Sequence, residues 1–250
     1  RDVVFGYAPG RPVLHGVTLT VRPGEHVAVV GRTGSGKTTL LNLLGGLYAP
    51  WTGAVRVHGR DPLSFGDRDR RRALGVVPQA VQLFSGSVLD NLTLRDPAVS
   101  EEAARAAARL AGADVFVRAL PRGYDTRVAG GGHGGGVELS SGQRQLLALA
   151  RALAAEPPFL VLDEATSAVD AVTDAAFRAA LAPSLAAGRG VLTVAHRLAT
   201  AAAADRVIVL EHGVIVEEGT PEELLARGGR FAALKELEAA TNYQAQVSGW

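Results

Sequence analysis

Residues 31–38 have the types and the spacing of a phosphate-binding loop. They read GRTGSGKT, after the apolar run His26–Val30 and at the start of the helix-like run Lys37–Leu44. Glycines recur in such loops because backbone N–H groups converge on phosphate oxygens only where side chains do not block them. The helix that follows directs the positive end of its dipole at the same anion. The segment therefore predicts a site for nucleotide phosphates rather than a glycine-rich turn that matches by accident.

Lys37 has the most specific chemistry in this loop. Only two of the 26 basic residues, Lys37 and Lys235, are lysines, and the others are arginines. A lysine ammonium is a compact point charge that suits the outer phosphates, which the planar guanidinium of arginine does not match. Thr38 offers a hydroxyl group to Mg²⁺. The expected nucleotide contacts in this region are Gly31, Thr33, Gly34, Ser35, Gly36, Lys37, Thr38 and Thr39.

Two adjacent carboxylates, Asp163 and Glu164, stand at the end of a second apolar run, residues 159–162. Successive side chains of a strand point in opposite directions, so the two acids are expected to take different roles. Asp163 is predicted to reach the Mg²⁺ shell, whereas Glu164 is free to hold and polarise an attacking water. Two solvated acids at a strand end are the alternative, but the phosphate loop upstream favours the catalytic interpretation.

His196 follows another apolar run, residues 191–195. We expect this run to lie beside the strand that precedes the phosphate loop, which would place His196 near the γ-phosphate. A surface or core histidine is the alternative, and it is our interpretation of the other five, which are His15, His26, His58, His133 and His212.

The elements that must position these residues alternate between strands and helices. Strand patterns cover residues 3–7, 13–21, 26–30, 54–58, 74–77, 159–163, 191–194, 207–210 and 214–218, the last two as a hairpin. Helical patterns cover residues 37–44, 100–120, 143–155 and 170–185, and two more lie before a polar tail at 241–250 that is expected to be loosely ordered. Several strands are apolar throughout, which predicts an α/β domain with a parallel sheet covered on both faces. Residues 88–155 are expected to form an inserted helical subdomain.

Composition limits the classes of function. Hydrophobic residues make up 47% of the 250 residues, which is enough for a substantial core, and a net charge of +1 does not indicate nucleic acid as a partner. The absence of cysteine excludes disulfides, thiolate metal sites and cysteine nucleophiles. We find no signal peptide and no membrane span. The sequence has no Met and opens at Arg1 in a strand-like run, so we expect a piece of a longer or trimmed polypeptide.

Taken together, the motifs resemble the nucleotide-binding domain of an exporter-type ABC transporter (ATP-binding cassette), from Tyr7 to about Ala239. Their order is Tyr7, the phosphate loop, Gln79 after a strand, LSSGQ at residues 139–143, Asp163 and Glu164, SAVD at residues 167–170, and His196. The resemblance implies a P-loop NTPase parallel-sheet core, an N-terminal antiparallel β part and a helical subdomain, together about residues 1–240. A transmembrane domain is expected to precede them.

The resemblance also implies roles for two residues outside the catalytic motifs. Tyr7 would stack on adenine, although an aromatic residue of a strand in a core is a serious alternative. Gln79 would touch Mg²⁺ and relay to the membrane domain, and the alternative is a polar residue in a turn after Pro78.

In this family the LSSGQ signature acts across a dimer. Ser140, Gly142 and Gln143 would bind the γ-phosphate held by the other subunit, at the N-terminus of a helix. Residues 167–170 would cross to the opposing subunit, with Asp170 as their acid. Two ATP molecules would then be enclosed between two nucleotide-binding domains.

The sequence departs from the family pattern at two places. Ser141 stands where the family has its first signature glycine, and its Cβ would crowd the phosphate. YDTRV at residues 124–128 is followed by AGGGHGGGVE, which is longer than the usual short loop and lacks its early glutamate. The coupling role of that loop towards the membrane domain is therefore in doubt.

The function implied is an ATPase subunit of a membrane transporter, with ATP and Mg²⁺ as ligands. Its partners would be the transmembrane domain of the same transporter and a second nucleotide-binding domain, at the cytoplasmic face of the cell membrane. The alternatives are a regulatory, weakly active half of a heterodimer, a separate importer ATPase subunit, and a non-transport cassette for DNA repair or translation. The substrate is not encoded here, because specificity would lie in the membrane helices.

Overall fold

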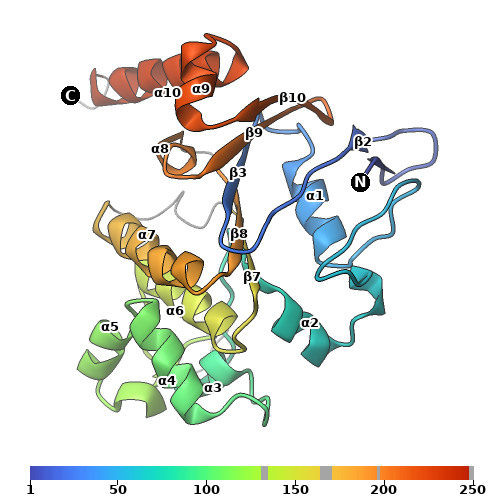
Figure 1. Ribbon diagram of the computed structural model, residues 1–250. Coiled ribbons are helices and arrows are strands. Elements are labelled where there is room, and N and C mark those ends of the chain that lie inside the picture. Colours follow the sequence, from blue (N-terminus) through green and yellow to red (C-terminus); the bar gives the residue numbers. More distant parts are fainter. Residues whose placement is uncertain (131–134, 164–170, 196–197, 248–250) are drawn as a thin grey trace. The chain divides into compact units, whose positions relative to one another are not determined.

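The computed structural model describes residues 1–130, 135–163, 171–195 and 198–247, and it is mixed α/β (Figure 1). The chain folds into two compact units, one made of Arg1–Gly66 and Val191–Trp250, the other of Asp67–Gly190. The block expected to form a helical subdomain, residues 88–155, falls in the second unit, which also includes residues 67–87 and 156–190.

In the first unit, strand β3 (His26–Val30) is buried along its whole length. It pairs in parallel with β8 (Gly190–Val194), where Val191 lies opposite His26, and with β9 (Arg206–Glu211). The β9 strand continues into an antiparallel partner, β10 (Val214–Gly219), through the expected hairpin. The predicted placement of the run at residue 191 beside the strand of the phosphate loop is therefore confirmed.

A small antiparallel sheet, β1 (Val3–Phe5) with β2 (Leu14–Val17), forms the N-terminal β part as expected. The strand predicted at residues 54–58 is wrong, because the chain turns there. Val57 and Arg60 exchange backbone hydrogen bonds of 2.9 and 3.1 Å, and both residues between them, His58 and Gly59, have positive φ angles of 49° and 75°. This is the geometry of a tight two-residue turn, which an alternating pattern does not reveal.

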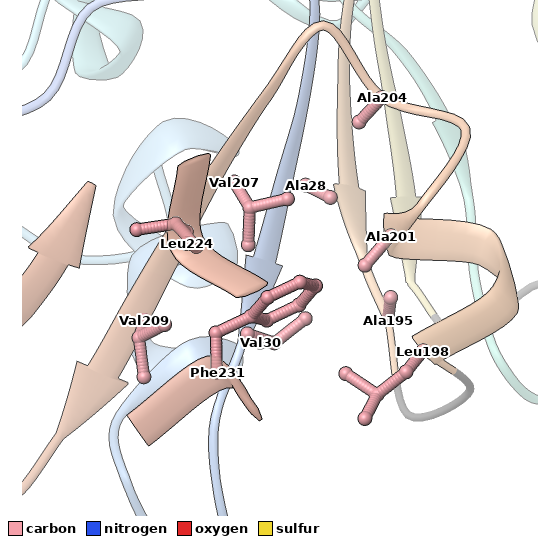
Figure 2. Close-up of a cluster of buried hydrophobic side chains, with 10 residues drawn as sticks. All are labelled: Ala28, Val30, Ala195, Leu198, Ala201, Ala204, Val207, Val209, Leu224 and Phe231. Carbon is pink, nitrogen blue, oxygen red and sulfur yellow. The ribbon is translucent and has the colours of Figure 1, made fainter. Parts of the chain in front are cut away.

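The described residues of the first unit also form the α-helices α1 (Lys37–Leu44), α8 (Leu198–Ala201), α9 (Pro221–Ala226) and α10 (Arg230–Val247), and a 3-10 helix at Pro62–Ser64. Ten buried residues from the strands, these helices and their connections form one core cluster, shown in Figure 2: Ala28, Val30, Ala195, Leu198, Ala201, Ala204, Val207, Val209, Leu224 and Phe231. Helix α10 continues to Val247, into the segment expected to be a loosely ordered tail. This helix contains no glycine or proline, the two residues that most disfavour a helix, so the helical conformation continues.

In the second unit, β4 (Gly75–Val77) pairs in parallel with β7 (Phe159–Asp163). Its helices are α2 (Asp67–Ala73), α3 (Val88–Thr93), α4 (Glu101–Leu110), α5 (Asp114–Ala119), α6 (Ser141–Leu153) and α7 (Ala171–Ala186). Two short strands, β5 (Gly86–Ser87) and β6 (Arg127–Val128), pair antiparallel among them. Mostly parallel strands, helices in both units and a small antiparallel sheet confirm the predicted α/β class.

The single helix expected over residues 100–120 is two helices, α4 and α5. Ser100 begins α4 as predicted, since its hydroxyl oxygen accepts a 3.1 Å hydrogen bond from the Ala103 N–H. Gly112 ends the continuity, because its φ of 73° is left-handed and turns the chain before α5.

Candidate nucleotide-binding site

The phosphate loop joins β3 to α1 and depends on two glycines. A Cβ atom on Gly31 would lie 2.1 Å from the carbonyl oxygen of Leu210. Gly36 has a φ of 107°, and a Cβ there would lie 2.7 Å from a methyl carbon of Leu14. Gly36 is also the N-cap of α1, and no side chain in the described parts of the chain caps that helix. The backbone N–H groups of its first turn are therefore arranged for an anion.

Two buried polar groups lie in this loop. Lys37 is 5% exposed, and its ammonium group donates hydrogen bonds to the carbonyl oxygens of Gly31 (2.7 Å) and Arg32 (3.0 Å). Ser35 is 4% exposed, and its hydroxyl oxygen has no hydrogen-bond partner among residues 1–130 or the other described segments. A buried hydroxyl without a partner is unfavourable, and phosphate oxygens would satisfy it.

The remaining expected contacts of the loop differ in exposure. Thr33, Gly34 and Thr38 are exposed. Thr39 is buried, and its hydroxyl lies 3.2 Å from the hydroxyl of Tyr7. The structure therefore brings Thr39 together with Tyr7.

Tyr7 is 53% exposed as a residue, and its ring lies beside an aromatic cluster. It meets the rings of Phe5 and Tyr48 edge-on, at centroid distances of 5.2 and 5.3 Å. Its hydroxyl also accepts a 3.0 Å hydrogen bond from the Asn42 side chain. The ring is thus held at its polar end and by two T-shaped ring contacts, and it is not buried in a core.

Asp163 is the last residue of β7 and is half-buried at the end of that strand, as the apolar run before it predicts. Besides Lys37, two residues are expected to be catalytic, Glu164 and His196. Both lie outside the described residues, as does Asp170 of the SAVD segment. Their expected roles stay predictions.

Gln79 lies two residues beyond β4 and is exposed. Its backbone carbonyl oxygen accepts a 3.1 Å hydrogen bond from the side-chain amide of Gln145 in α6. The residues that follow, 80–85, belong to no helix or strand. Their conformation must therefore be set by contacts with neighbouring elements.

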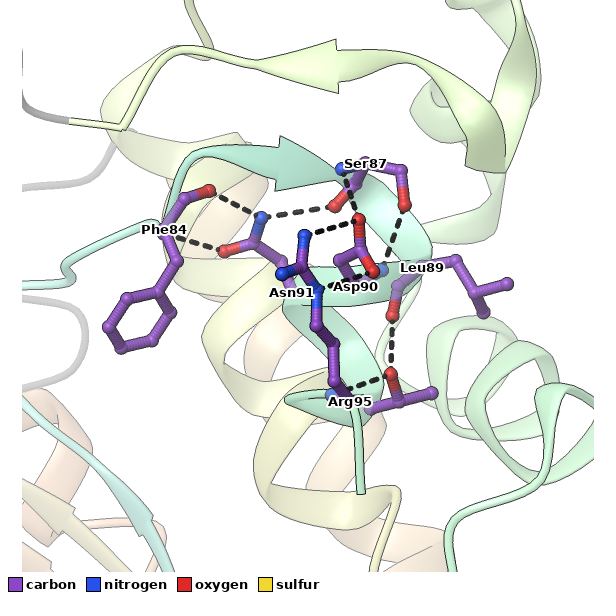
Figure 3. Close-up of polar contacts among 7 residues, drawn as sticks. Phe84, Ser87, Leu89, Asp90, Asn91 and Arg95 are labelled. Atoms are coloured by element: carbon purple, nitrogen blue, oxygen red, sulfur yellow. Dashed lines mark hydrogen bonds and ion pairs between the residues drawn. The ribbon is translucent and has the colours of Figure 1, made fainter. Parts of the chain in front are cut away.

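Side chains from α3 and α6 supply such contacts, and those from Asn91 of α3 to Phe84 and Ser87 are drawn in Figure 3. The Asn91 amide accepts from the backbone N–H of Phe84 (2.9 Å) and donates to the carbonyl oxygens of Phe84 (2.8 Å) and Ser87 (3.0 Å). Arg151 of α6 donates to the carbonyl oxygens of Gln82 (3.0 Å) and Asn91 (2.8 Å). Burial lowers the pKa of Arg151 to about 10, so this guanidinium stays charged at neutral pH.

The start of α3 is fixed by a capping box, also visible in Figure 3. Ser87 accepts from the Asp90 N–H, and the Asp90 carboxylate accepts from the Ser87 N–H, each at 2.9 Å. Hydrogen bonding from Arg95 lowers the pKa of Asp90 to about 2. The end of the segment after Gln79 is therefore anchored at α3.

The signature residues form the first turn of α6. The hydroxyl oxygen of Ser140 accepts from the Gln143 N–H (3.2 Å), and the Gln143 side chain accepts from the Ser140 N–H (2.9 Å). This capping box leaves the hydroxyl hydrogen of Ser140 able to donate to an anion. Ser140 and Ser141 are exposed, whereas Gly142 is buried. The three expected contact residues thus lie within one helical turn.

Sequence analysis did not identify Asn91, Gln145 and Arg151 as residues that hold the Gln79 segment. The signal was weak but present, because Gln145 and Arg151 are polar residues within the mostly apolar run of α6. Periodicity alone assigns such residues to a solvated helix face. Only the hydrogen bonds to distant carbonyl groups show that these side chains face other segments of the protein.

Comparison with known proteins agrees with this geometry. A family model described as ABC transporter matches residues 14–167. The beta-(1-->2)glucan export ATP-binding/permease protein NdvA of Rhodopseudomonas palustris is 44% identical over 234 residues, which are 94% of this chain and 38% of the relative. The mycobactin import ATP-binding/permease protein IrtB of Mycolicibacterium smegmatis is 45% identical over 229 residues, 92% of this chain and 39% of the relative.

A solved structure is similar over the same extent. It is the structure of a bacterial Atm1-family ABC exporter with ATP bound, with a TM-score of 0.85 and 37% identity over 95% of this chain and 41% of the exporter chain. The present chain spans less than half the length of these relatives. Within its described residues, no helix is both long enough and apolar enough to cross a membrane. The chain belongs to the ABC transporter family, as an ATPase domain.

Proposed function

We propose that the chain hydrolyses Mg²⁺-bound ATP together with a second nucleotide-binding domain. This would power substrate movement through the transmembrane domain of the same transporter, at the cytoplasmic face of a membrane. The relatives are named as combined ATP-binding/permease proteins, which supports a transmembrane partner. One of these relatives is named for export and the other for import.

The observation that carries the proposal is the phosphate loop. Its glycines keep the backbone free of side chains, α1 begins without a side-chain cap from the described residues, and the ammonium of Lys37 is buried beside it. The hydroxyl of Ser35 is buried as well. Together these groups fit the β- and γ-phosphates of a nucleotide. The Lys37 ammonium donates to two loop carbonyl oxygens, which it would exchange for phosphate oxygens.

The chemistry of the side chains fits Mg²⁺. Thr38, Gln79 and Asp163 offer a hydroxyl, an amide and a carboxylate oxygen, and Mg²⁺ prefers such hard oxygen ligands along with phosphates and water. When bound, the ion would neutralise charge on the phosphates during transfer. We assign these three residues to the metal on the family resemblance.

Turnover would require Glu164 and His196. Glu164 would accept a proton from the attacking water, and His196 would contact the γ-phosphate. Tyr7, which is about half exposed, would stack on adenine. Ser140, Gly142 and Gln143 would bind the γ-phosphate held by the second domain.

One observation favours a second candidate function. Ser141 places a side chain where the family resemblance expects glycine, in the exposed first turn of α6. Because the signature would act across the dimer, the weakened ATP site would be the partner's. The chain would then be one half of a heterodimer. Its own phosphate loop would be intact, and the ATP site at the phosphate loop of its partner would hydrolyse ATP more slowly.

ATP hydrolysis measured over a wide range of protein concentration tests both candidates, with Glu164→Gln as background. A self-paired ATPase shows specific activity that rises with concentration and disappears in the variant. Binding of ATP without activity above the background, at every concentration, would contradict self-pairing and support the heterodimer. Failure to bind ATP would contradict the proposal as a whole.

A further inference from the structure

Gln145 lies in the second turn of α6, and only 6% of it is exposed. Its side-chain amide nitrogen donates a 3.1 Å hydrogen bond to the backbone carbonyl oxygen of Gln79, 66 residues away in the sequence. Because a carbonyl oxygen accepts and does not donate, the N–H end of the amide must face Gln79. The orientation of this side chain is therefore settled by its partner.

The other end of the same amide is not satisfied. The oxygen Oε1 of Gln145 is buried, and no hydrogen-bond partner for it exists in the part of the chain that the structure describes. A buried acceptor without a partner lowers stability, so an apolar side chain of similar length would fit this place at least as well. Stability therefore does not account for a glutamine here, whereas the contact with Gln79 does.

Gln79 stands where neither a helix nor a strand fixes the backbone. It follows Pro78 and opens the irregular segment 79–85, whose far end is held by Asn91 and Arg151. Gln145 acts at the near end, at the one residue of the segment with an expected metal-binding role. It stands four residues after Ser141, so the first two turns of α6 carry both the signature and the contact to Gln79.

We propose that Gln145 is a positioning residue for Gln79. It holds the backbone of Gln79 against α6, so that the amide of Gln79 meets Mg²⁺ in a fixed place and shifts only together with the signature turn. This rests on the proposed function, because it assumes that Gln79 binds the metal of Mg²⁺-bound ATP.

The test compares four proteins: the wild-type chain, Gln145→Met, Gln79→Ala and the double variant. Methionine keeps the length of the side chain and removes the donor. We expect Gln145→Met to lower kcat and to raise the Mg²⁺ concentration for half-maximal activity, each by about 10-fold. This is the lower end of the loss usually seen when a residue that orients a metal ligand is removed. Its melting temperature should equal or exceed that of the wild type. Gln145→Leu is the second variant should Met fold poorly.

Two readouts do not depend on turnover. Calorimetry should show that Gln145→Met binds ATP normally without Mg²⁺ and gains less affinity when Mg²⁺ is added. Hydrogen exchange of residues 79–83 should be several-fold faster than in the wild type. Ser184→Ala, which removes another buried side-chain hydrogen bond of the second unit, is the matched control and should change none of these.

The double variant decides between positioning and an independent effect. If Gln145 acts through Gln79, adding Gln145→Met to Gln79→Ala has no further effect on the Mg²⁺ dependence. Additive losses in the double variant would overturn the positioning role of Gln145. So would a wild-type Mg²⁺ dependence in Gln145→Met when Gln79→Ala is impaired. Neither result would contradict the proposed metal role of Gln79. Unchanged Mg²⁺ dependence in Gln79→Ala would instead refute the proposed metal role of Gln79, on which the inference rests.

Discussion

At the scale of single residues, the two lysines of the chain lie in contrasting surroundings. Lys37 is buried, with its ammonium against the carbonyl oxygens of the phosphate loop, whereas Lys235 is exposed on α10. The ammonium donates to two backbone carbonyl oxygens of the loop, and the oxygens of a phosphate are stronger acceptors for the same donor. The loop is thus arranged for a stronger anionic acceptor.

Lys37→Ala is predicted to weaken ATP binding by about 30-fold, which corresponds to roughly 2 kcal/mol for a charge-assisted hydrogen bond. Equilibrium titration with ATP measures this. Lys235→Ala removes the same charge from an exposed position and serves as the control, with unchanged affinity. Equal affinity in all three proteins would refute the phosphate assignment.

His26 predicts a pH dependence of stability. It is 5% exposed in β3, and its Nε2 atom lies 2.8 Å from the Thr193 hydroxyl of β8. Burial lowers the pKa of His26, against the opposing effect of the Asp205 carboxylate. The unfolded chain therefore binds a proton at higher pH than the folded one, and stability falls as the pH drops below about 6.5.

Urea unfolding of the wild type and His26→Asn between pH 5 and pH 8 measures this effect. The wild type should lose free energy of unfolding more steeply below pH 6.5 than the variant, and the two should run parallel above it. Parallel curves over the whole range would mean that His26 does not contribute to the pH dependence.

At the scale of elements, helix starts decide where functional groups lie. Ser140 and Ser100 cap α6 and α4 in the same way, each with a hydroxyl oxygen that accepts from the N–H three residues on. Only the first of these caps belongs to the signature. The pair therefore separates the contribution of capping from that of nucleotide contact.

Ser140→Ala and Ser100→Ala are each predicted to lower the free energy of unfolding by about 1 kcal/mol. Only Ser140→Ala should also lower ATP hydrolysis, because it removes a donor to the γ-phosphate as well as a cap. Chemical denaturation and steady-state hydrolysis measure the two effects. If both variants lose activity equally, the loss comes from destabilisation and the signature assignment fails.

At the scale of the whole molecule, the chain consists of two compact units, and the residues proposed to contact nucleotides are divided between them. The phosphate loop belongs to the first unit, and Gln79, Asp163 and the signature belong to the second. A complete site would in addition need the signature of a second domain. Association should therefore depend on bound ATP.

We predict that Glu164→Gln with ATP sediments as a dimer, because ATP binds but is not removed by hydrolysis. The same protein without ATP should sediment as a monomer. Adding Lys37→Ala to this variant should prevent association at the same ATP concentration. A dimer of equal stability with and without ATP would show that the nucleotide does not join the two copies.

The sequence by itself determined the parts of this protein that depend on neighbours along the chain. The strand His26–Val30, the helix Lys37–Leu44 and the strand Phe159–Asp163 were predicted to the residue, since an uninterrupted apolar run and a glycine-to-helix junction are local signals. The α/β class and the family followed from the order of those segments. The roles of Glu164 and His196 remain predictions, because they lie outside the described residues.

The tertiary structure decided what depends on contacts between distant segments. Residues 54–58 alternate like a strand, yet Val57 and Arg60 close a turn there. The contact between Gln145 and Gln79 spans 66 residues, and no local pattern indicates it. A polar residue in a buried helix face is read from the sequence as solvated, because only the fold shows which distant carbonyl group it meets.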